Sequence, residues 1–268
     1  MGTQIFRHEL KKHRRALLFW GVGVIALMFA AMTKYSTIIE VGDTSMTQLI
    51  AQLPQMMQAM FGMADLDIAS LEGYFGICFL YLVLMLAVHA GLLGAAVIGD
   101  EERDKTTEFL YVKPIRRSRV ITKKLTAGVV LLLVLWVVSM IGSWAAVAVS
   151  ASTDGFLPIF MVFMQAALII QLVFFSLGVM LAAVLPNYRL PGKIIAGVVF
   201  AEYFLYVLSK FAPQFDGLRH LTIFRMYDAV DIVANGQLDV LSVGACIVMI
   251  VVVIAIAYWV YPRRDLGV

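Results

Sequence analysis

Long apolar blocks alternate with short charged segments along this chain. Six blocks are apolar enough to cross a hydrocarbon core, which requires about 20 helical residues. The fourth block is longer than that and is expected to tilt, whereas the fifth is short and contains Glu202. The pattern predicts an all-α fold, namely a polytopic membrane protein with six transmembrane helices. The blocks are Ala16–Met32, Tyr74–Ile98, Leu125–Ser150, Phe156–Leu185, Ile194–Leu208 and Val240–Val260.

The composition supports a membrane location for the whole chain. Of its 268 residues, 62% are hydrophobic and 15% are charged, against roughly 45–50% and about 25% in soluble domains. We therefore expect residues 1–268 to form a single membrane domain. Cys78 and Cys246 both lie in apolar blocks, so we interpret them as packing residues without a disulfide.

The distribution of positive charge predicts which loops face the cytoplasm. Segments 1–15, 99–124, 186–193 and 261–268 hold 17 of the 21 Lys and Arg residues. Because Lys and Arg concentrate in cytoplasmic loops, both termini should be cytoplasmic and segments 33–73 and 209–239 should lie outside. The net charge of +3 is then explained by topology and does not indicate nucleic-acid binding.

The amino-terminal segment has its own amphipathic pattern. Ile5, Phe6 and Leu10 stand among five basic residues between Arg7 and Arg15. Such a helix would lie along an anionic membrane surface before the chain turns inward. The alternative is that these charges only set the topology.

The first outside segment contains a methionine-rich helical pattern that Pro54 should kink or divide. Thioethers suit Cu(I), so copper binding is one hypothesis. Methionine is also common on adaptable apolar faces, and no His or Cys lies nearby. We therefore favour a packing or interfacial helix and predict no metal site. The methionines are Met46, Met56, Met57, Met60 and Met63.

The chain lacks a phosphate-binding loop, a nucleophile elbow and an HExxH motif. We therefore expect no enzymatic activity and no cofactor in this chain. Four polar residues within the spans are candidates for a translocation path: His89, Gln165, Gln171 and Glu202. A structural hydrogen bond is the commoner role for a residue like His89, and for Glu202 both roles stay open.

The segment Asp100–Lys124 interrupts the apolar pattern, with 13 charged residues among 25. Phe109, Leu110 and Val112 form an apolar edge within it, and Pro114 follows. An apolar anchor surrounded by charges is typical of a protein-docking surface. We predict a short cytoplasmic helix here that docks a partner.

Three stretches resemble ABC-2 type permeases. The first is "EERDKTTEFLYVKPIRRSRVITKKL", although Lys105 stands in the region of the family's glycine. The second is the carboxyl end "VYPRRDLGV", and the third is Leu53–Gly76. In the first stretch the matching positions are Glu101 or Glu102, Thr106 or Thr107, Glu108, Phe109, Leu110, Pro114, Arg117 or Arg119, and Lys123 or Lys124. In the second they are Tyr261, Arg263, Arg264, Asp265 and Leu266.

The resemblance implies the permease subunit of an ATP-binding-cassette exporter in a plasma membrane, most typically of a bacterium. Two permeases would pair, as a homodimer or a heterodimer, above two cytosolic ATPases that bind ATP and Mg²⁺. A coupling helix between the second and third spans would receive the ATPase motion. Its implied residues are Glu101, Glu102, Thr106, Thr107, Glu108, Phe109, Leu110, Pro114 and Arg117.

Two other function classes remain as alternatives. One is a non-transport membrane protein, either a lipid-acting enzyme or a structural partner. Its cytoplasmic acids would be Glu9, Asp100–Glu108 and Asp265, which are interleaved with bases and better explained by docking. The other is an ion-coupled carrier that uses Glu202 and His89, although the paired repeats typical of such carriers are not evident.

Overall fold

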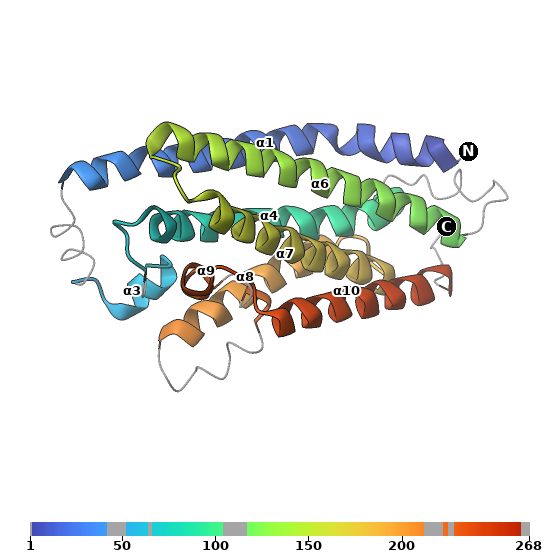
Figure 1. Cartoon of the computed structure of the whole chain (residues 1–268). Helices are drawn as coiled ribbons and strands as arrows, with labels where there is room; N and C mark the ends of the chain where they lie inside the picture. The colour runs from blue at the N-terminus through green and yellow to red at the C-terminus, as the bar shows by residue number, and fades with distance from the viewer. Residues whose placement is uncertain are drawn as a thin grey trace.

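The computed structural model describes residues 2–41, 52–63, 66–103, 117–211, 222–224 and 228–263. Within these ranges the chain is helical and has no strand. Six long helices are long and apolar enough to cross a membrane, which confirms the predicted spans (Figure 1). They are α1 (Gly2–Val41), α4 (Leu71–Arg103), α6 (Arg117–Ser150), α7 (Leu157–Val184), α8 (Pro191–Phe211) and α10 (Val240–Val260).

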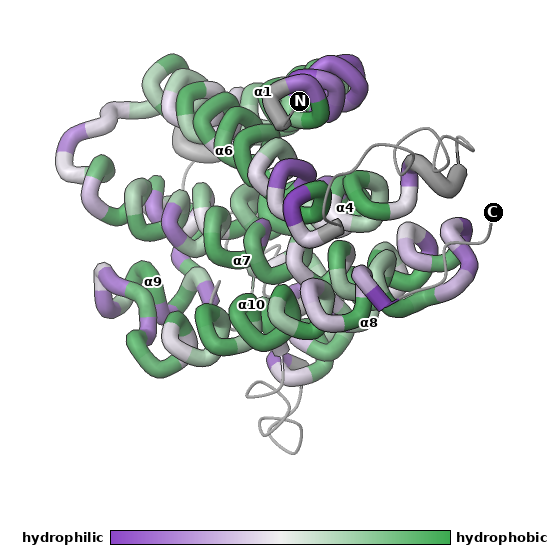
Figure 2. Tube along the Cα trace, turned by 90° about the vertical axis from the view of Figure 1, so that its right-hand side faces the viewer, coloured by the Kyte–Doolittle hydropathy of each residue, from purple (hydrophilic) through white to green (hydrophobic). Residues whose placement is uncertain are grey.

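The six helices run in alternating directions between two ends of the bundle. We call one of them the basic end: α1 and α6 begin there and α4 and α10 finish there (Figure 1). In Figure 2, which faces this end, hydrophilic residues gather at the start of α1, whereas the long helices are mostly hydrophobic elsewhere. The opposite end carries the short helices α3 (Gln55–Met60) and α9 (Ala229–Asn235).

The structure corrects our prediction for the amino-terminal segment. Residues 2–15 do not form a separate helix that turns into the membrane, because α1 continues without interruption for 40 residues. Its basic residues Arg7, Arg14 and Arg15 are exposed, whereas Glu9 is buried against the neighbouring helices. Within this segment, Glu9 is buried and Leu10 packs against the hydrophobic core.

The predicted loop 99–124 is also shorter than we expected. Helix α4 continues to Arg103 and α6 begins at Arg117, so both borders of the segment are helical. Glu101 and Glu102 lie in the last turn of α4, and Arg117 is the first residue of α6. The remaining predicted coupling residues, Thr106, Thr107, Glu108, Phe109, Leu110 and Pro114, lie outside the described residues.

Helices α4 and α7 form the centre of the bundle. Phe75 and Phe79 of α4 stack with one another and meet Phe160 and Phe163 of α7 at centroid distances of 5.0–5.7 Å. Closer to the basic end, the two backbones approach so closely that a Cβ atom on Gly178 would collide with a backbone carbonyl of α4. Such close contact between small residues is typical of helix packing in membranes.

The outer helices expose apolar side chains to their surroundings. On α10 these include Leu241, Val248, Val251 and Trp259, and on α1 they include Phe19. A buried stripe attaches α10 to α7, and Tyr258 Oη donates to Thr122 Oγ1 of α6 over 2.9 Å. Exposed apolar faces of this extent suit contact with lipid or with another membrane helix.

Candidate functional site

Five charged or titratable side chains meet between α1, α4 and α6 at the basic end. We call them the charge cluster: Glu9, Lys12 and His13 from α1, Asp100 from α4 and Lys124 from α6. Lys12 Nζ lies 3.0 Å from Asp100 Oδ2, and Lys124 Nζ lies 3.6 Å from Glu9 Oε1. His13 Nε2 lies between the two carboxylates, 3.5 Å from Glu9 and 3.8 Å from Asp100.

Lys124 is the most deeply placed member of the charge cluster. Its side chain is fully buried, and Nζ donates a 2.6 Å hydrogen bond to the Val97 carbonyl of α4. A buried ammonium is costly to desolvate unless a carboxylate and further acceptors surround it. Glu9 supplies that carboxylate, so this pair joins α6 to both α1 and α4.

The local sequence explains how α1 contributes three members. Positions 9, 12 and 13 fall on one side of a helix because residues three and four apart are neighbours on its surface. Asp100 follows the apolar block of α4 after Gly99, and Lys124 directly precedes that of α6. Their proximity therefore follows from the packing of the three helix ends.

The charge cluster corrects one of our interpretations. We assigned Glu9 and Asp100 to a solvent-facing docking surface, but both side chains are almost fully buried. The signal that sequence reasoning missed was the i, i+3, i+4 spacing of Glu9, Lys12 and His13. Although two carboxylates and an imidazole come together, no group among the described residues has a metal-binding arrangement.

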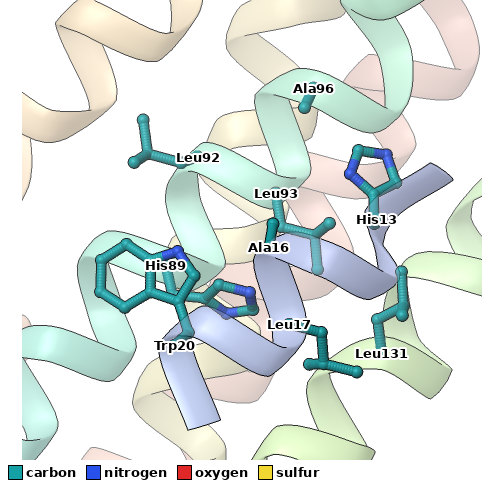
Figure 3. A pocket seen from close by; sticks show the side chains of 9 residues that line it. All are labelled: His13, Ala16, Leu17, Trp20, His89, Leu92, Leu93, Ala96 and Leu131. Atoms are coloured by element: carbon teal, nitrogen blue, oxygen red, sulfur yellow. The ribbon is translucent and has the colours of Figure 1, made fainter. Parts of the chain in front are cut away.

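A cavity of about 130 Å³ lies next to the charge cluster, between α1, α4 and α6. We call it the α1–α4 pocket, and it is only partly enclosed. Figure 3 shows His13 and His89 at its two ends, with Ala16 and Leu93 between them. The lining residues are His13, Ala16, Leu17, Trp20, His89, Leu92, Leu93, Ala96 and Leu131.

His89 is buried in the wall of this pocket, beside the Trp20 indole at a centroid distance of 5.4 Å. We expected a structural hydrogen bond for this residue, but within the described part of the chain its Nδ1 has no partner. A buried imidazole without a partner is unfavourable by about 1–3 kcal/mol. His89 is therefore the predicted polar residue best placed to meet a ligand.

Glu202 of α8 has a structural partner in the short turn at 222–224. Its Oε2 accepts a 2.9 Å hydrogen bond from the Ile223 backbone N–H. Nearby, Lys210 Nζ of α8 lies 2.7 Å from Asp228 Oδ2, and Asp228 also caps α9 by accepting from Val230 N. Glu202 thus fastens the short turn at 222–224 to α8.

The two glutamines of α7 differ in their burial. Gln165 is exposed, whereas Gln171 is fully buried and its amide has no partner among the described residues. Neither lines the α1–α4 pocket. Of the four polar residues that we predicted for a translocation path, only His89 lines the α1–α4 pocket.

Comparison with known proteins gives one match over almost the whole chain. A family model described as "ABC-2 family transporter protein" matches residues 3–266. No curated protein matches the chain.

Proposed function

The chain belongs to the ABC-2 family of transporter proteins, and from this premise we propose that it is the permease subunit of an ATP-driven exporter. Membership and six membrane-crossing helices support the role of a permease. We place ATP hydrolysis, with its Mg²⁺, in a separate cytosolic ATPase, since the chain has no phosphate-binding loop. The chain itself would be neither an enzyme nor the holder of a cofactor.

The charge cluster is the observation that carries the coupling part of this proposal. Residues 104–116, which include most of the proposed ATPase contact, connect α4 to α6. Lys124 of α6 joins both Val97 of α4 and Glu9 of α1. A displacement of this segment would therefore move three helix ends as one body, which is the rigid-body response expected of a transport subunit.

We place the basic end in the cytoplasm of a bacterial cell, with both termini inside and the protein in the plasma membrane. The positive-inside rule supports this orientation. It also positions segment 104–116 where a cytosolic ATPase can reach it.

We propose a second permease subunit as a partner within the membrane. The exposed apolar faces of α1 and α10 leave room for such a partner as well as for lipid. Chemical crosslinking of the complex between permease subunits, as a homodimer or with a sibling chain, tests this part independently of the ATPase.

The decisive experiment is co-purification with an ABC ATPase, which this proposal expects to be encoded beside the gene. We expect Phe109→Asp combined with Leu110→Asp to abolish association and transport, because two new charges would occupy the apolar anchor of the contact. Leu190→Asp is the control, since Leu190 is an exposed apolar residue in the connection between α7 and α8. Unchanged ATPase association in the double variant would refute the coupling assignment.

The ion-coupled carrier is the weaker candidate. Its proposed carboxylate, Glu202, already accepts a backbone hydrogen bond from Ile223. Transport that stops when ATP is exhausted and continues without a proton gradient would support the exporter. The reverse pattern would support the carrier.

A further inference from the structure

We propose that the α1–α4 pocket binds an uncharged amphipathic molecule. One aryl or short alkyl group of the ligand would lie against Trp20, and a hydroxyl or carbonyl group of the same molecule would bond to His89. The transport role of this site rests on the proposed function and gives it a substrate class. The binding itself does not depend on any ATPase.

The size of the pocket sets the size of the group that enters it. Its volume is about 130 Å³, close to the roughly 150 Å³ of an apolar cavity that takes up benzene. A single ring or a short alkyl segment therefore fits, and a larger molecule would extend through the open side. Seven of the nine lining residues are apolar, so burial of such a group is favourable.

His89 supplies the polar contact that fixes the orientation. Its Nδ1 has no hydrogen-bond partner within the described part of the chain, although the residue is buried. A neutral imidazole offers one donor and one acceptor. A ligand hydroxyl can form a hydrogen bond with either ring nitrogen, whereas a ligand carbonyl can accept one only from the nitrogen that carries the proton.

The electrostatics at the other end of the pocket favour an uncharged ligand. His13 there is backed by the carboxylates of Glu9 and Asp100, and Lys124 and Lys12 lie against these same carboxylates. Each carboxylate therefore already has a lysine partner, so neither is left to attract a cationic ligand.

The test uses the purified full-length chain in detergent micelles, with 4-bromophenol and bromobenzene as probes. Bromine quenches tryptophan fluorescence at short range. The quenching that is seen in the unmodified chain but not in Trp20→Phe is the quenching of Trp20. We expect saturable quenching of Trp20 by both probes. Ala96→Leu, which fills the pocket, should abolish that saturable part.

His89→Leu separates the polar contact from the apolar one. We expect His89→Leu to raise the dissociation constant of 4-bromophenol about two- to tenfold, which corresponds to the loss of one neutral hydrogen bond. The dissociation constant of bromobenzene should stay nearly unchanged. Equal weakening of both probes would overturn the role of His89. Quenching that never saturates, or that survives Ala96→Leu, would overturn the pocket itself.

A second arm distinguishes a membrane lipid from a separate amphipathic molecule. The chain is placed in nanodiscs of phosphatidylcholine brominated on its acyl chains, and bromine-free phenol is added. Relief of Trp20 quenching would identify an acyl chain with its ester carbonyl as the occupant. Quenching unaffected by phenol would assign the site to separate molecules. None of these measurements involves the ATPase, so failure here and failure of ATPase co-purification are distinguishable.

Discussion

Removing the buried ammonium of Lys124 should destabilise the bundle far more than removing the charge beside it. Lys124 and Lys123 are consecutive in α6, but Lys124 is fully buried whereas Lys123 is exposed. The substitution Lys124→Met keeps a long flexible side chain and removes the charge that faces Glu9. Lys123→Met makes the same chemical change in an exposed position.

The expected magnitude follows from the burial of Glu9. Without Lys124, the Glu9 carboxylate loses its lysine partner at 3.6 Å while its side chain remains 2% exposed. Breaking a buried ion pair from one side costs about 3–5 kcal/mol. Glu9→Met should destabilise the chain for the same reason, since it leaves Lys124 without its carboxylate. The double variant, Glu9→Met with Lys124→Met, should lose at least about 1 kcal/mol less than the sum of the two single losses, because contacting residues are coupled by roughly 0.5–3 kcal/mol.

The free energy of unfolding can be measured in mixed micelles by titration with dodecyl sulfate, followed by circular dichroism. We expect Lys123→Met to stay within about 0.5 kcal/mol of the unmodified chain, as for other surface changes. The reasoning fails if Lys124→Met costs no more than Lys123→Met. It also fails if the double variant loses the full sum of the two single losses.

Three further sets of substitutions test contacts elsewhere in the bundle. Gly178→Ala should cost about 1–3 kcal/mol, because its Cβ would collide with the Gly91 carbonyl, whereas the new Cβ in the control Gly244→Ala meets no atom within 4 Å and should not destabilise the chain. Equal thermal unfolding midpoints for the two variants would contradict the close packing of α4 and α7. Glu202→Gln keeps an acceptor for the Ile223 N–H and should change the free energy of unfolding by less than about 1 kcal/mol, whereas Glu202→Leu should lower it by about 1–3 kcal/mol. Equal losses in both variants would show that the negative charge, and not the hydrogen bond alone, stabilises the turn. Asp228→Ala should cost about 1–2 kcal/mol, because it removes the side chain that caps α9. Hydrogen exchange of the α9 amides should become faster, and an unchanged exchange rate would refute the capping role.

The spans could be predicted because a bilayer imposes one requirement on every crossing segment. Val240–Val260 was predicted and found with the same limits, since all 21 of its residues are apolar or small. The ends of α4 and α6 were harder to predict. Charged residues such as Arg103 and Arg117 continue a helix beyond the apolar block, and composition alone does not distinguish such an extension from a loop.

The site depended on tertiary packing that no single segment contains. Glu9, Asp100 and Lys124 are each ordinary charged residues near a membrane border, and only the alignment of three helices makes them a buried group. The α1–α4 pocket likewise combines residues from positions 13 to 131. His89 was identified because a histidine inside an apolar span is unusual, but its pocket could not be anticipated without the position of Trp20.

The continuity of α1 has a mechanical consequence. From Lys12, which is tied to Asp100, to Tyr35, whose hydroxyl donates to the Ala69 carbonyl over 3.0 Å, the helix extends about 35 Å as one rod. A tilt of about 5° around Lys12 would shift the Tyr35 end by about 3 Å, by the same helix dimensions. That shift is as long as the Tyr35 bond itself, and a second bond, from Tyr74 to the Ala31 carbonyl, lies on the same stretch of α1. Because α1 is one continuous helix, a small rotation at one end of the bundle would thus break the hydrogen bonds of Tyr35 and Tyr74 at the other end.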